Sequence, residues 1–252
     1  MAISVRVPSP SDAPSEPIRI TPLPNMVWIP GGTVCMGTDS PYLQEMPVRE
    51  VIVGGFWIDK YPVTNERFSR FVAETRYVTF AEIPPDQADY PGVLPYMLYA
   101  GSLVFHRPTG PAGRGDIGNW WSYVRGADWR HPRGAHSSTC GLDRHPVVHI
   151  TLADAQAFAE WEGKELPTEA EWEFAARGGV AELPWQKLVE GGSEGTWPVD
   201  ALPGNDYGVH GMIGNIWEWT CDWDVARHHA YVRQAVTSTS HLGFRCVVRS
   251  HR

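Results

Sequence analysis

Residues 205–220 read NDYGVHGMIGNIWEWT, and the fold of the chain can be worked out from this stretch outward. The stretch contains five glycines or asparagines, which tolerate unusual backbone angles, and its two tryptophans flank Glu218. It follows neither a helical nor a strand period. Such a stretch can arrange backbone carbonyls and one carboxylate around a small concavity, which is how proteins hold hard cations such as Ca²⁺. Composition alone favours the alternative, a glycine-rich turn that leads into a strand with inward-packed tryptophans.

The composition indicates one large domain or two small ones. The chain has 252 residues, is 42% hydrophobic and contains 25 Gly, 22 Pro and 12 Trp. This mixture is typical of an irregular, loop-rich fold held by large aromatic side chains. The net charge is -8 and no basic patch is visible, which argues against binding to nucleic acid or to an anionic membrane.

Targeting and redox features of the sequence indicate a cytoplasmic protein. No signal peptide is recognisable, and no apolar run approaches the ~20 residues that a membrane span needs. The cysteines form no CxxC pair and fit no zinc framework. We therefore expect unpaired thiols in a reducing compartment at Cys35, Cys140, Cys221 and Cys246.

The chain divides into a tail and one ordered domain. Residues 1–25 contain six prolines and read as a flexible tail, whereas residues 26–252 form the domain. A Gly-Gly pair between two short apolar runs predicts a hairpin over 26–37. A second extended segment follows over 47–58, where Gly54-Gly55 indicates a bulge.

Three helices are marked by their capping residues. Thr64 precedes apolar residues at helical spacing and predicts the first helix. Capping boxes begin the other two, because a threonine precedes an acidic residue by three positions in each: Thr151 with Asp154, and Thr168 with Glu171. The last of these helices ends at a Gly-Gly pair.

Several polar or aromatic clusters have structural explanations. His145 and His149 fall on a predicted strand, where they would lie ~13 Å apart and could not share an ion. The acidic side chains after Thr168 match the positive end of a helix dipole and need no acid–base role: Glu169, Glu171 and Glu173. His228-His229 reads as a solvated loop. Because large aromatic side chains dominate core burial, we expect four tryptophans to lie in the core rather than in a groove: Trp120, Trp121, Trp217 and Trp219.

Two regions complete the chain. The connection over 82–125 is long and aromatic, which is typical of a functional loop or a packed Ω-loop. A final strand is predicted over 242–248.

Motifs in a fixed order carry a family resemblance. They are MVWIPGG at 26–32, PVTN at 62–65, WRHP at 129–132, HPVV at 145–148, LPTEAEWEFAARGG at 166–179, GNIWEWT at 214–220 and GFRC at 243–246. Over about residues 26–248, the chain resembles the formylglycine-generating enzymes of prokaryotic type, also called sulfatase-modifying factors.

The resemblance implies the fold and the activity. The expected fold is α+β and irregular, a variant of the C-type-lectin fold with little regular secondary structure. Members of this family oxidise one Cys of a Cys-x-Pro-x-Arg segment in an unfolded sulfatase to Cα-formylglycine, using O₂ and copper. The implied partner is thus an unfolded sulfatase polypeptide, and we expect the chain to be a monomer.

The resemblance also implies structural calcium, which we carry over residue by residue. One family site matches the carbonyls of Gly214 and Ile216 and the carboxylate of Glu218. The fourth ligand of that site is an Asn or Asp side chain, and Gly211 stands at the matching position. The second family calcium segment would follow Trp185, and nothing in this sequence matches it.

The copper ligands implied by the resemblance are missing from the sequence. The family holds Cu(I) between two cysteines in a segment that should lie between Trp223 and Ser238, and only fourteen residues without a cysteine stand there. Either the chain is a truncated, catalytically inactive member, or the 252-residue sequence lacks loops of the natural polypeptide. We favour the second explanation because both gaps fall at loop junctions while every framework motif is intact.

Two other functions are weighed against the oxidase. The chain could be a non-catalytic module that binds a peptide through the aromatic surface of residues 90–129. A non-haem iron enzyme of the sulfoxide-synthase type is disfavoured, because Thr151 stands where the iron motif needs a Glu. Extracellular family members carry disulfides at the positions of Ala159 and Ala176, so Cys246 has no expected partner here.

Overall fold

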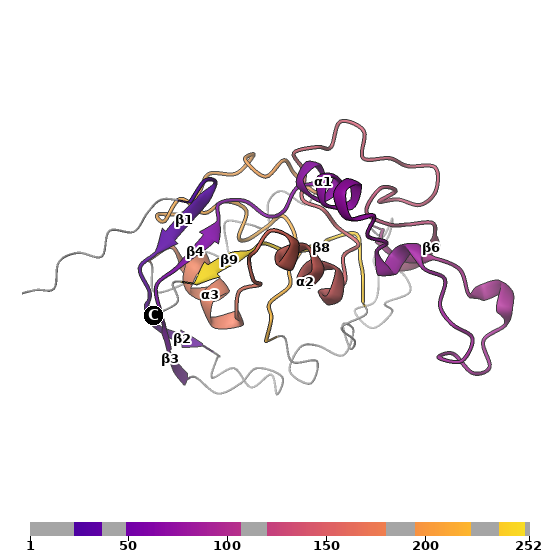
Figure 1. Cartoon of the computed structure of the whole chain (residues 1–252), viewed down its shortest axis with the longest axis horizontal. Coiled ribbons are helices and arrows are strands. Elements are labelled where there is room, and N and C mark those ends of the chain that lie inside the picture. Colours follow the sequence, from indigo (N-terminus) through magenta and orange to yellow (C-terminus); the bar gives the residue numbers. More distant parts are fainter. Residues whose placement is uncertain (1–22, 37–48, 107–119, 180–194, 223–236, 250–252) are drawn as a thin grey trace, which may run out of the picture.

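Three short strands from distant parts of the sequence form the central sheet (Figure 1). The computed structural model describes residues 23–36, 49–106, 120–179, 195–222 and 237–249. Within them, β1 (Met26–Ile29) and β9 (Val247–Arg249) both pair antiparallel with β4 (Phe56–Asp59). Ile58 sits opposite both Val27 and Val247 and is fully buried. The sheet thus ties the start of the domain to its end.

The hairpin expected over 26–37 is wrong. β2 (Gly32–Met36) pairs with β3 (Arg49–Val53) in a sheet of its own. Gly31 explains the separation: its φ is +76°, and a Cβ there would lie 2.6 Å from the carbonyl oxygen of Val53. The close packing of these backbones redirects the chain into a second sheet. Gly54-Gly55 likewise separates β3 from β4 instead of forming a bulge in one strand.

All three predicted helices are confirmed with their caps. α1 (Asn65–Thr75) begins at Thr64, whose side chain accepts a hydrogen bond from the backbone N–H of Arg67. α2 (Leu152–Trp161) and α3 (Glu169–Arg177) both begin with the predicted capping boxes. α3 ends at Gly178, which has φ +60° and would clash with Asn205 if it carried a Cβ.

The region over 82–125 contains a strand pair that the sequence did not predict. β5 (Gly101–Phe105) pairs antiparallel with β6 (Trp121–Arg125), and two 3₁₀ helices precede it, η1 (Phe80–Glu82) and η2 (Pro95–Met97). The segment between η1 and β5 projects away from the rest of the fold (Figure 1). The last pair is parallel: β7 (Trp217–Glu218) lies beside β8 (Leu242–Gly243).

Two strand predictions are wrong. Residues 145–151 form no strand but cross the molecule with single backbone hydrogen bonds, from Val147 to Val63 and from His149 to Thr239. His149 adopts φ +62°, which no strand accommodates. The final strand is also divided into β8 and β9, because Arg245 and Cys246 turn between the two sheets.

The core consists of two clusters of buried side chains. One surrounds α1 and α2 and is centred on aromatic rings: Phe68, Phe71, Phe158, Trp129, Trp219 and Phe244. The other packs the central sheet against α3 and includes Ile29, Ile58, Ala175 and Met212.

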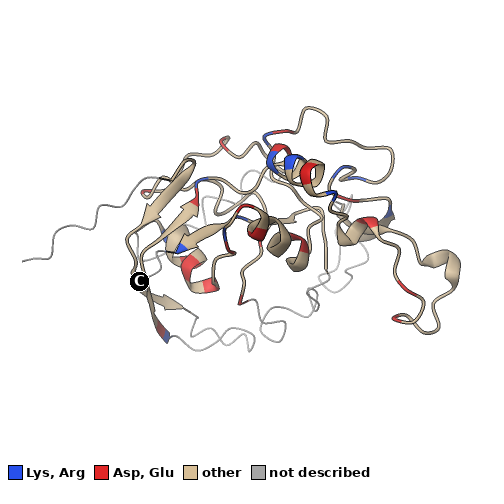
Figure 2. Ribbon diagram, viewed as in Figure 1, with Lys and Arg blue, Asp and Glu red and all other residues tan. Residues whose placement is uncertain are grey.

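Acidic and basic residues are interspersed along α1 and the neighbouring loops (Figure 2). The small sheets and three short helices confirm the irregular α+β class.

Some expectations fall outside the described residues. They concern most of the tail (residues 1–22), Trp185 and His228-His229. No helix in the described ranges is both long and apolar enough to cross a bilayer.

Candidate functional site

Glu218, the predicted calcium ligand, lies on β7 with its carboxylate completely buried. Arg245 donates to it twice, from Nε to Oε2 at 2.6 Å and from Nη2 to Oε1 at 2.8 Å. The indole Nε1 of Trp172 on α3 donates to Oε2 at 2.9 Å. Both ionic side chains have no solvent-exposed surface. This is the bidentate guanidinium–carboxylate geometry that gives the strongest hydrogen bonds of this type.

Arg245 uses its remaining N–H groups to join distant segments. It donates to the backbone carbonyls of Asp59 at 3.2 Å and His210 at 2.9 Å. A buried charge is tolerated only when it is paired and its hydrogen bonds are satisfied, and Arg245 meets both conditions. The Glu218–Arg245 pair therefore fixes the 205–220 stretch against the end of β4.

The residues matched to the family calcium site do not make a complete calcium site as they stand. Gly214 is exposed with φ +91°, and Ile216 is buried. Neither residue has a side-chain oxygen, so each can offer only its backbone carbonyl. The carboxylate of Glu218 already accepts three hydrogen bonds and is neutralised by Arg245. Gly211 has no side chain to add, whereas calcium sites use six to eight oxygens with carboxylates among them. Calcium binding stays an untested implication of the resemblance, and the saturated carboxylate argues against it.

An aromatic surface lies directly beside Glu218. Trp217 is 61% exposed, so its predicted place in the core is wrong. Its ring and that of Trp121 contact the imidazole of His241, with centroids 5.3 Å and 4.7 Å away. Trp219 behaves differently because the chain leaves β7 after Glu218 and turns inward: Trp219 is buried, and its Nε1 donates to the carbonyl of Ile150 at 2.8 Å.

His149 lies behind this surface, buried and fully hydrogen-bonded. Its Nδ1 is 2.8 Å from the hydroxyl of Ser102, and its Nε2 is 2.9 Å from the carbonyl oxygen of Pro132. Burial lowers the pKa of His149 to about 4, so the ring is neutral at pH 7. The pKa of His241 is also lowered to about 4, mainly by burial and secondarily by His149. His145 has another partner, the hydroxyl of Thr196 at 2.9 Å, which agrees with separate structural roles for His145 and His149.

The described thiols do not fit a copper site. Cu(I) needs closely placed thiolates. Three cysteines are exposed and Cys246 is buried. Burial raises the pKa of Cys246 well above its ordinary value, and burial with Asp222 raises that of Cys221, so both remain protonated thiols. In the described ranges, no cluster of three His, Cys, Asp or Glu side chains could hold a metal ion.

Two of the three α3 carboxylates, Glu171 and Glu173, have the structural roles that were predicted for them. Glu171 accepts from the backbone of Thr168 at 2.7 Å and pairs with Arg249, while Glu173 pairs with Arg177. No sequence pattern predicted a second ionic cluster, which surrounds Asp59. Its members come from β4, α1 and the end of α2: Asp59, Arg67, Glu162 and Lys164. Only the fold brings them together.

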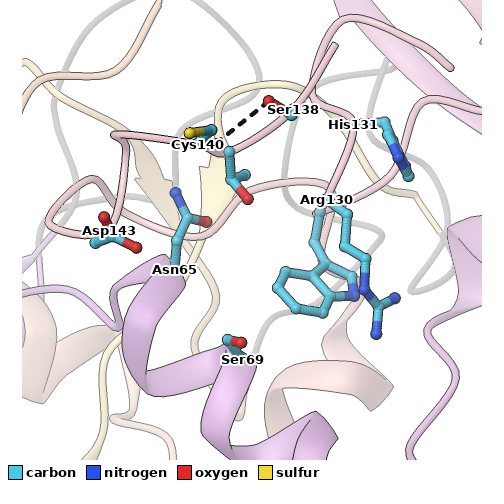
Figure 3. A pocket seen from close by; sticks show the side chains of 9 residues that line it. Asn65, Ser69, Arg130, His131, Ser138, Cys140 and Asp143 are labelled. Atoms are coloured by element: carbon cyan, nitrogen blue, oxygen red, sulfur yellow. Dashed lines mark hydrogen bonds between the residues drawn. The ribbon is translucent and has the colours of Figure 1, made fainter. Parts of the chain in front are cut away.

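A pocket at the start of α1 was not predicted either. We call it the α1 pocket; it has a volume of about 280 Å³ (Figure 3). Its lining comes from α1, the WRHP motif and the turn that follows: Asn65, Ser69, Trp129, Arg130, His131, Ser138, Thr139, Cys140 and Asp143. The WRHP and PVTN motifs both contribute residues to this pocket. These two motifs are the only sequence signal from which the pocket could have been predicted.

Solved structures share this fold. PvdO from Pseudomonas aeruginosa superposes with a TM-score of 0.54 at 21% identity, covering 88% of this chain and 93% of PvdO. Treponema denticola variable protein 1 gives a TM-score of 0.51 at 16% identity, covering 89% and 95%. At these identities the likeness concerns the fold alone.

Curated relatives are closer in sequence. The formylglycine-generating enzyme of Mycobacterium tuberculosis is 42% identical, covering 79% of this chain and 74% of that protein. The mouse formylglycine-generating enzyme is 39% identical, and the chain spans 61% of its length. The bovine protein named inactive C-alpha-formylglycine-generating enzyme 2 is 36% identical, covering 88% and 87%.

The family model supports the same assignment. The model of the sulfatase-modifying factor enzyme 1-like domain matches residues 11–232, which is most of the chain. Together with the curated relatives and the irregular α+β architecture, this match shows that the chain belongs to the formylglycine-generating-enzyme (sulfatase-modifying factor) family.

Proposed function

We propose that this protein is an oxidoreductase of the formylglycine-generating type. It would oxidise the CH₂–SH group of the Cys in a Cys-x-Pro-x-Arg segment of a sulfatase to an aldehyde, with O₂ as the oxidant and copper as the cofactor, and the sulfur would leave as sulfide. The observation that carries the proposal is the 42% identity to the M. tuberculosis enzyme. The intact framework, with its capped helices and the buried Glu218–Arg245 pair, is consistent with it.

The copper ligands would come from residues that the 252-residue sequence lacks. The alignment with the M. tuberculosis enzyme runs over 220 positions, whereas 79% of 252 residues is about 199. That enzyme therefore has residues inside the aligned region that have no counterpart here. Their presence agrees both with omitted loops and with a truncated member, and no step of the reaction is assigned to the four thiols of this sequence.

Within the described residues, the exposed aromatic surface is the best candidate for contact with the substrate. Trp217, His241 and Trp121 form it next to Ser238, where the family copper segment would rejoin the framework. An unfolded polypeptide offers apolar side chains and main-chain amides, which aromatic surfaces of this kind bind. Neutral His241 adds no charge to it at pH 7.

Two measurements on the protein purified from its natural source test this proposal. An intact mass above 28.1 kDa is expected, because the natural chain would contain the omitted loops. The copper-loaded protein should then convert a Cys-x-Pro-x-Arg peptide to the aldehyde. A mass of 28.1 kDa would contradict the omitted-loop hypothesis, and a heavier protein that forms no aldehyde would contradict the oxidase.

A second candidate is a catalytically inactive module that binds a peptide or a protein partner. Two relatives at 36% and 34% identity are named inactive enzymes, so this family includes such members. The projecting segment also exposes apolar side chains, among them Tyr90, Leu94, Tyr96 and Met97. Binding of the peptide without oxidation, by a protein of 28.1 kDa, would favour this function.

A further inference from the structure

The segment that projects between η1 and β5 concentrates the exposed apolar surface of the molecule (Figure 1). In the described ranges, most of the large apolar side chains that are exposed lie on this segment or on the neighbouring strands β5 and β6. The most exposed on the segment itself are Tyr96 at 71%, Leu94 at 52% and Met97 at 52%. Apolar surface that gathers in one region, rather than being scattered, marks an interaction site.

Four tyrosines of this region lie together, and we call them the tyrosine platform: Tyr90, Tyr96, Tyr99 and Tyr123. The ring centroids of Tyr99 and Tyr123 are 5.5 Å apart, and the hydroxyl of Tyr123 donates to the carbonyl of Tyr99 at 3.2 Å. Partial burial and the nearby hydroxyls of Tyr99 and Tyr90 raise the pKa of Tyr123, which places Tyr90 in the same neighbourhood.

Arg125 on β6 ties the platform to the strand pair. Its guanidinium lies 4.3 Å from the centroid of the Tyr99 ring, and its Nη2 donates to the carbonyl of Tyr96 at 3.3 Å. A cation over an aromatic face is an attractive contact. The charge of Arg125 is thus directed at a ring and a carbonyl of the platform itself.

The projecting segment is held in shape by its own hydrogen bonds. Nε2 of Gln87 donates to the carbonyls of Tyr90 and Val93, at 3.2 Å and 3.0 Å. Prolines restrict φ at further positions of the segment: Pro84, Pro85, Pro91 and Pro95. A surface that is ordered before binding loses little conformational entropy when a ligand docks on it.

The segment is acidic as well as aromatic. Residues 83–98 include Asp86 and Asp89 but contain no Lys or Arg. Both carboxylates are exposed, and neither forms an ion pair within the described ranges. A second copy of this chain is a poor partner, because the two acidic segments would repel each other and each chain has a net charge of -8. Charge complementarity favours a partner with a positive side chain.

The chemistry of the platform favours proline in that partner. Tyrosine rings offer flat apolar faces with a polar hydroxyl at one end. Proline-rich segments hold the extended polyproline II conformation before binding, and they dock on surfaces lined by aromatic rings. Addition of a partner strand is disfavoured, because residues 83–100 form turns and the 3₁₀ helix η2 instead of a strand.

We propose that the tyrosine platform binds an extended, proline-containing peptide segment that also carries an Arg or a Lys. The prolines stack on the exposed rings of Tyr90, Tyr96 and Tyr123, and the cation pairs with Asp86 or Asp89. This inference rests on the peptide-binding function proposed above, for which it names the ligand and the surface, and it requires no oxidase activity.

Fluorescence anisotropy with the 252-residue protein and three labelled peptides tests the ligand chemistry. The probe is the blocked peptide Ala-Pro-Arg-Ala-Leu-Pro-Pro-Leu-Pro. One matched peptide has Ala in place of every Pro, and the other has norleucine in place of the Arg. The Kd should rise about tenfold without the prolines and about threefold without the Arg, since exposed ion pairs contribute little. Equal Kd values for the three peptides, or no saturable binding of the probe, would overturn the proposal.

Substitutions test the surface. Tyr90→Ala and Tyr123→Ala should each raise the Kd of the probe about tenfold, and the double variant Asp86→Asn, Asp89→Asn should bind the Arg and norleucine peptides equally. Ile52→Ala is the matched control, because Ile52 is 85% exposed on β3, at the opposite side of the molecule (Figure 1). An unchanged Kd in both Tyr variants, with circular dichroism showing that they are folded, would contradict the assignment.

Other outcomes separate failure of the platform from failure of the binding function. If the Cys-x-Pro-x-Arg peptide binds with a Kd that both Tyr variants leave unchanged, the protein binds peptides through another surface and only the platform is overturned. Binding of neither peptide would contradict the platform and the binding function together. A dimer in sedimentation that Tyr90→Ala dissociates would place a second copy on the platform and would also overturn the proposal.

Discussion

The Glu218–Arg245 pair and the α1 pocket are both polar sites in the interior, but their hydrogen bonds are satisfied to different degrees. Glu218 accepts three hydrogen bonds, and Arg245 reaches a carboxylate and two backbone carbonyls. In the α1 pocket, Asn65 and Trp129 each keep one buried atom without a partner. The hydrogen bonds of the first site are complete within this chain, whereas the second leaves two buried atoms unpaired among the described residues.

This difference separates structure from binding. A saturated buried pair specifies how distant segments meet, because breaking it strands a charge in a medium of low dielectric constant. An unsaturated pair of atoms costs stability unless a ligand or water completes it. Calcium binding was expected at Glu218 from the family, yet the unsatisfied groups lie at α1. Substitutions at each site can show whether hydrogen-bond saturation distinguishes the two sites.

Breaking the Glu218–Arg245 pair should have the largest effect. Arg245→Met leaves the Glu218 carboxylate buried and unpaired, so the free energy of unfolding should fall by about 3–5 kcal/mol, measured by urea titration. Arg144→Met is the control, because Arg144 pairs with Asp200 on the surface and its loss should cost less than about 1 kcal/mol. Similar costs for both variants would contradict the structural role given to the buried pair.

His149 represents a third condition, because both ring nitrogens are hydrogen-bonded but burial disfavours the charged form of the ring. Folding lowers its pKa from 6.5 to about 4, so the unfolded chain binds more protons between these values. The contribution of His149 is therefore fully present above pH 6.5 and is lost as the pH falls toward 4. Between pH 7 and pH 5 we expect His149 to contribute a loss of about 2 kcal/mol. His241, whose pKa is also lowered to about 4, adds a loss of its own, so urea titrations of the protein and of a His149 variant at each pH would measure the His149 part.

A matched variant isolates this residue. His149→Asn keeps a side chain that tolerates the left-handed backbone, with φ +62°, but cannot titrate. The variant should be less stable at pH 7, yet its stability should fall less steeply down to pH 5. Carboxylates with lowered pKa, such as Glu162 and Glu171, contribute only at lower pH and do not disturb this window. An unchanged slope would show that folding does not lower the pKa of His149.

Two buried tryptophans sharpen the comparison within one residue type. Trp219 donates its Nε1 to Ile150, whereas Nε1 of Trp129 has no partner among the described residues. Trp219→Phe should therefore cost about 1–2 kcal/mol more than Trp129→Phe, since only the former leaves a buried carbonyl unpaired. Urea unfolding of both variants measures the difference. Equal costs would mean that Trp129 is bonded in solution, for instance to water.

The sequence predicted local structure well and long-range pairing poorly. Thr64, Thr151 and Thr168 begin helices where their caps indicated, because a capping interaction involves residues only three apart. The hairpin over 26–37 failed because strand pairing depends on contacts that are distant in sequence. β1 pairs with β4 rather than β2, and the positive φ of Gly31 is visible only in three dimensions.

The candidate sites show the same division. Glu218 could be singled out from the GNIWEWT motif, but its partner Arg245 lies 27 residues away in GFRC. The α1 pocket combines PVTN, WRHP and the turn before HPVV, whose meeting depends on backbone hydrogen bonds from Asn65 and Glu66. Motif spacing contains no information about which buried atoms remain unpaired.

Calcium provides the smallest expected effect and the most direct test of saturation at Glu218. The Glu218 carboxylate is paired to Arg245, and Gly211 has no side chain. The unsubstituted 252-residue protein should therefore melt at the same temperature in 1 mM Ca²⁺ and in chelator, within about 1 °C. Gly211→Asn restores the missing oxygen. The substitution is sterically feasible, because a Cβ at Gly211 would meet only Pro62, at 3.8 Å, and Asn is the side chain that best tolerates φ +63°.

Ca²⁺ should stabilise the Gly211→Asn variant by about 1 kcal/mol when its concentration is several times the Kd. Gly211→Ala is the control, since it introduces at least as much backbone strain without an oxygen ligand, and it should not respond to Ca²⁺. Thermal melts of the three proteins with and without Ca²⁺ make the comparison. If Ca²⁺ already stabilises the unsubstituted 252-residue protein strongly, the Glu218 carboxylate is not saturated by Arg245. The distinction between a saturated Glu218–Arg245 site and an unsaturated α1 pocket then fails at Glu218.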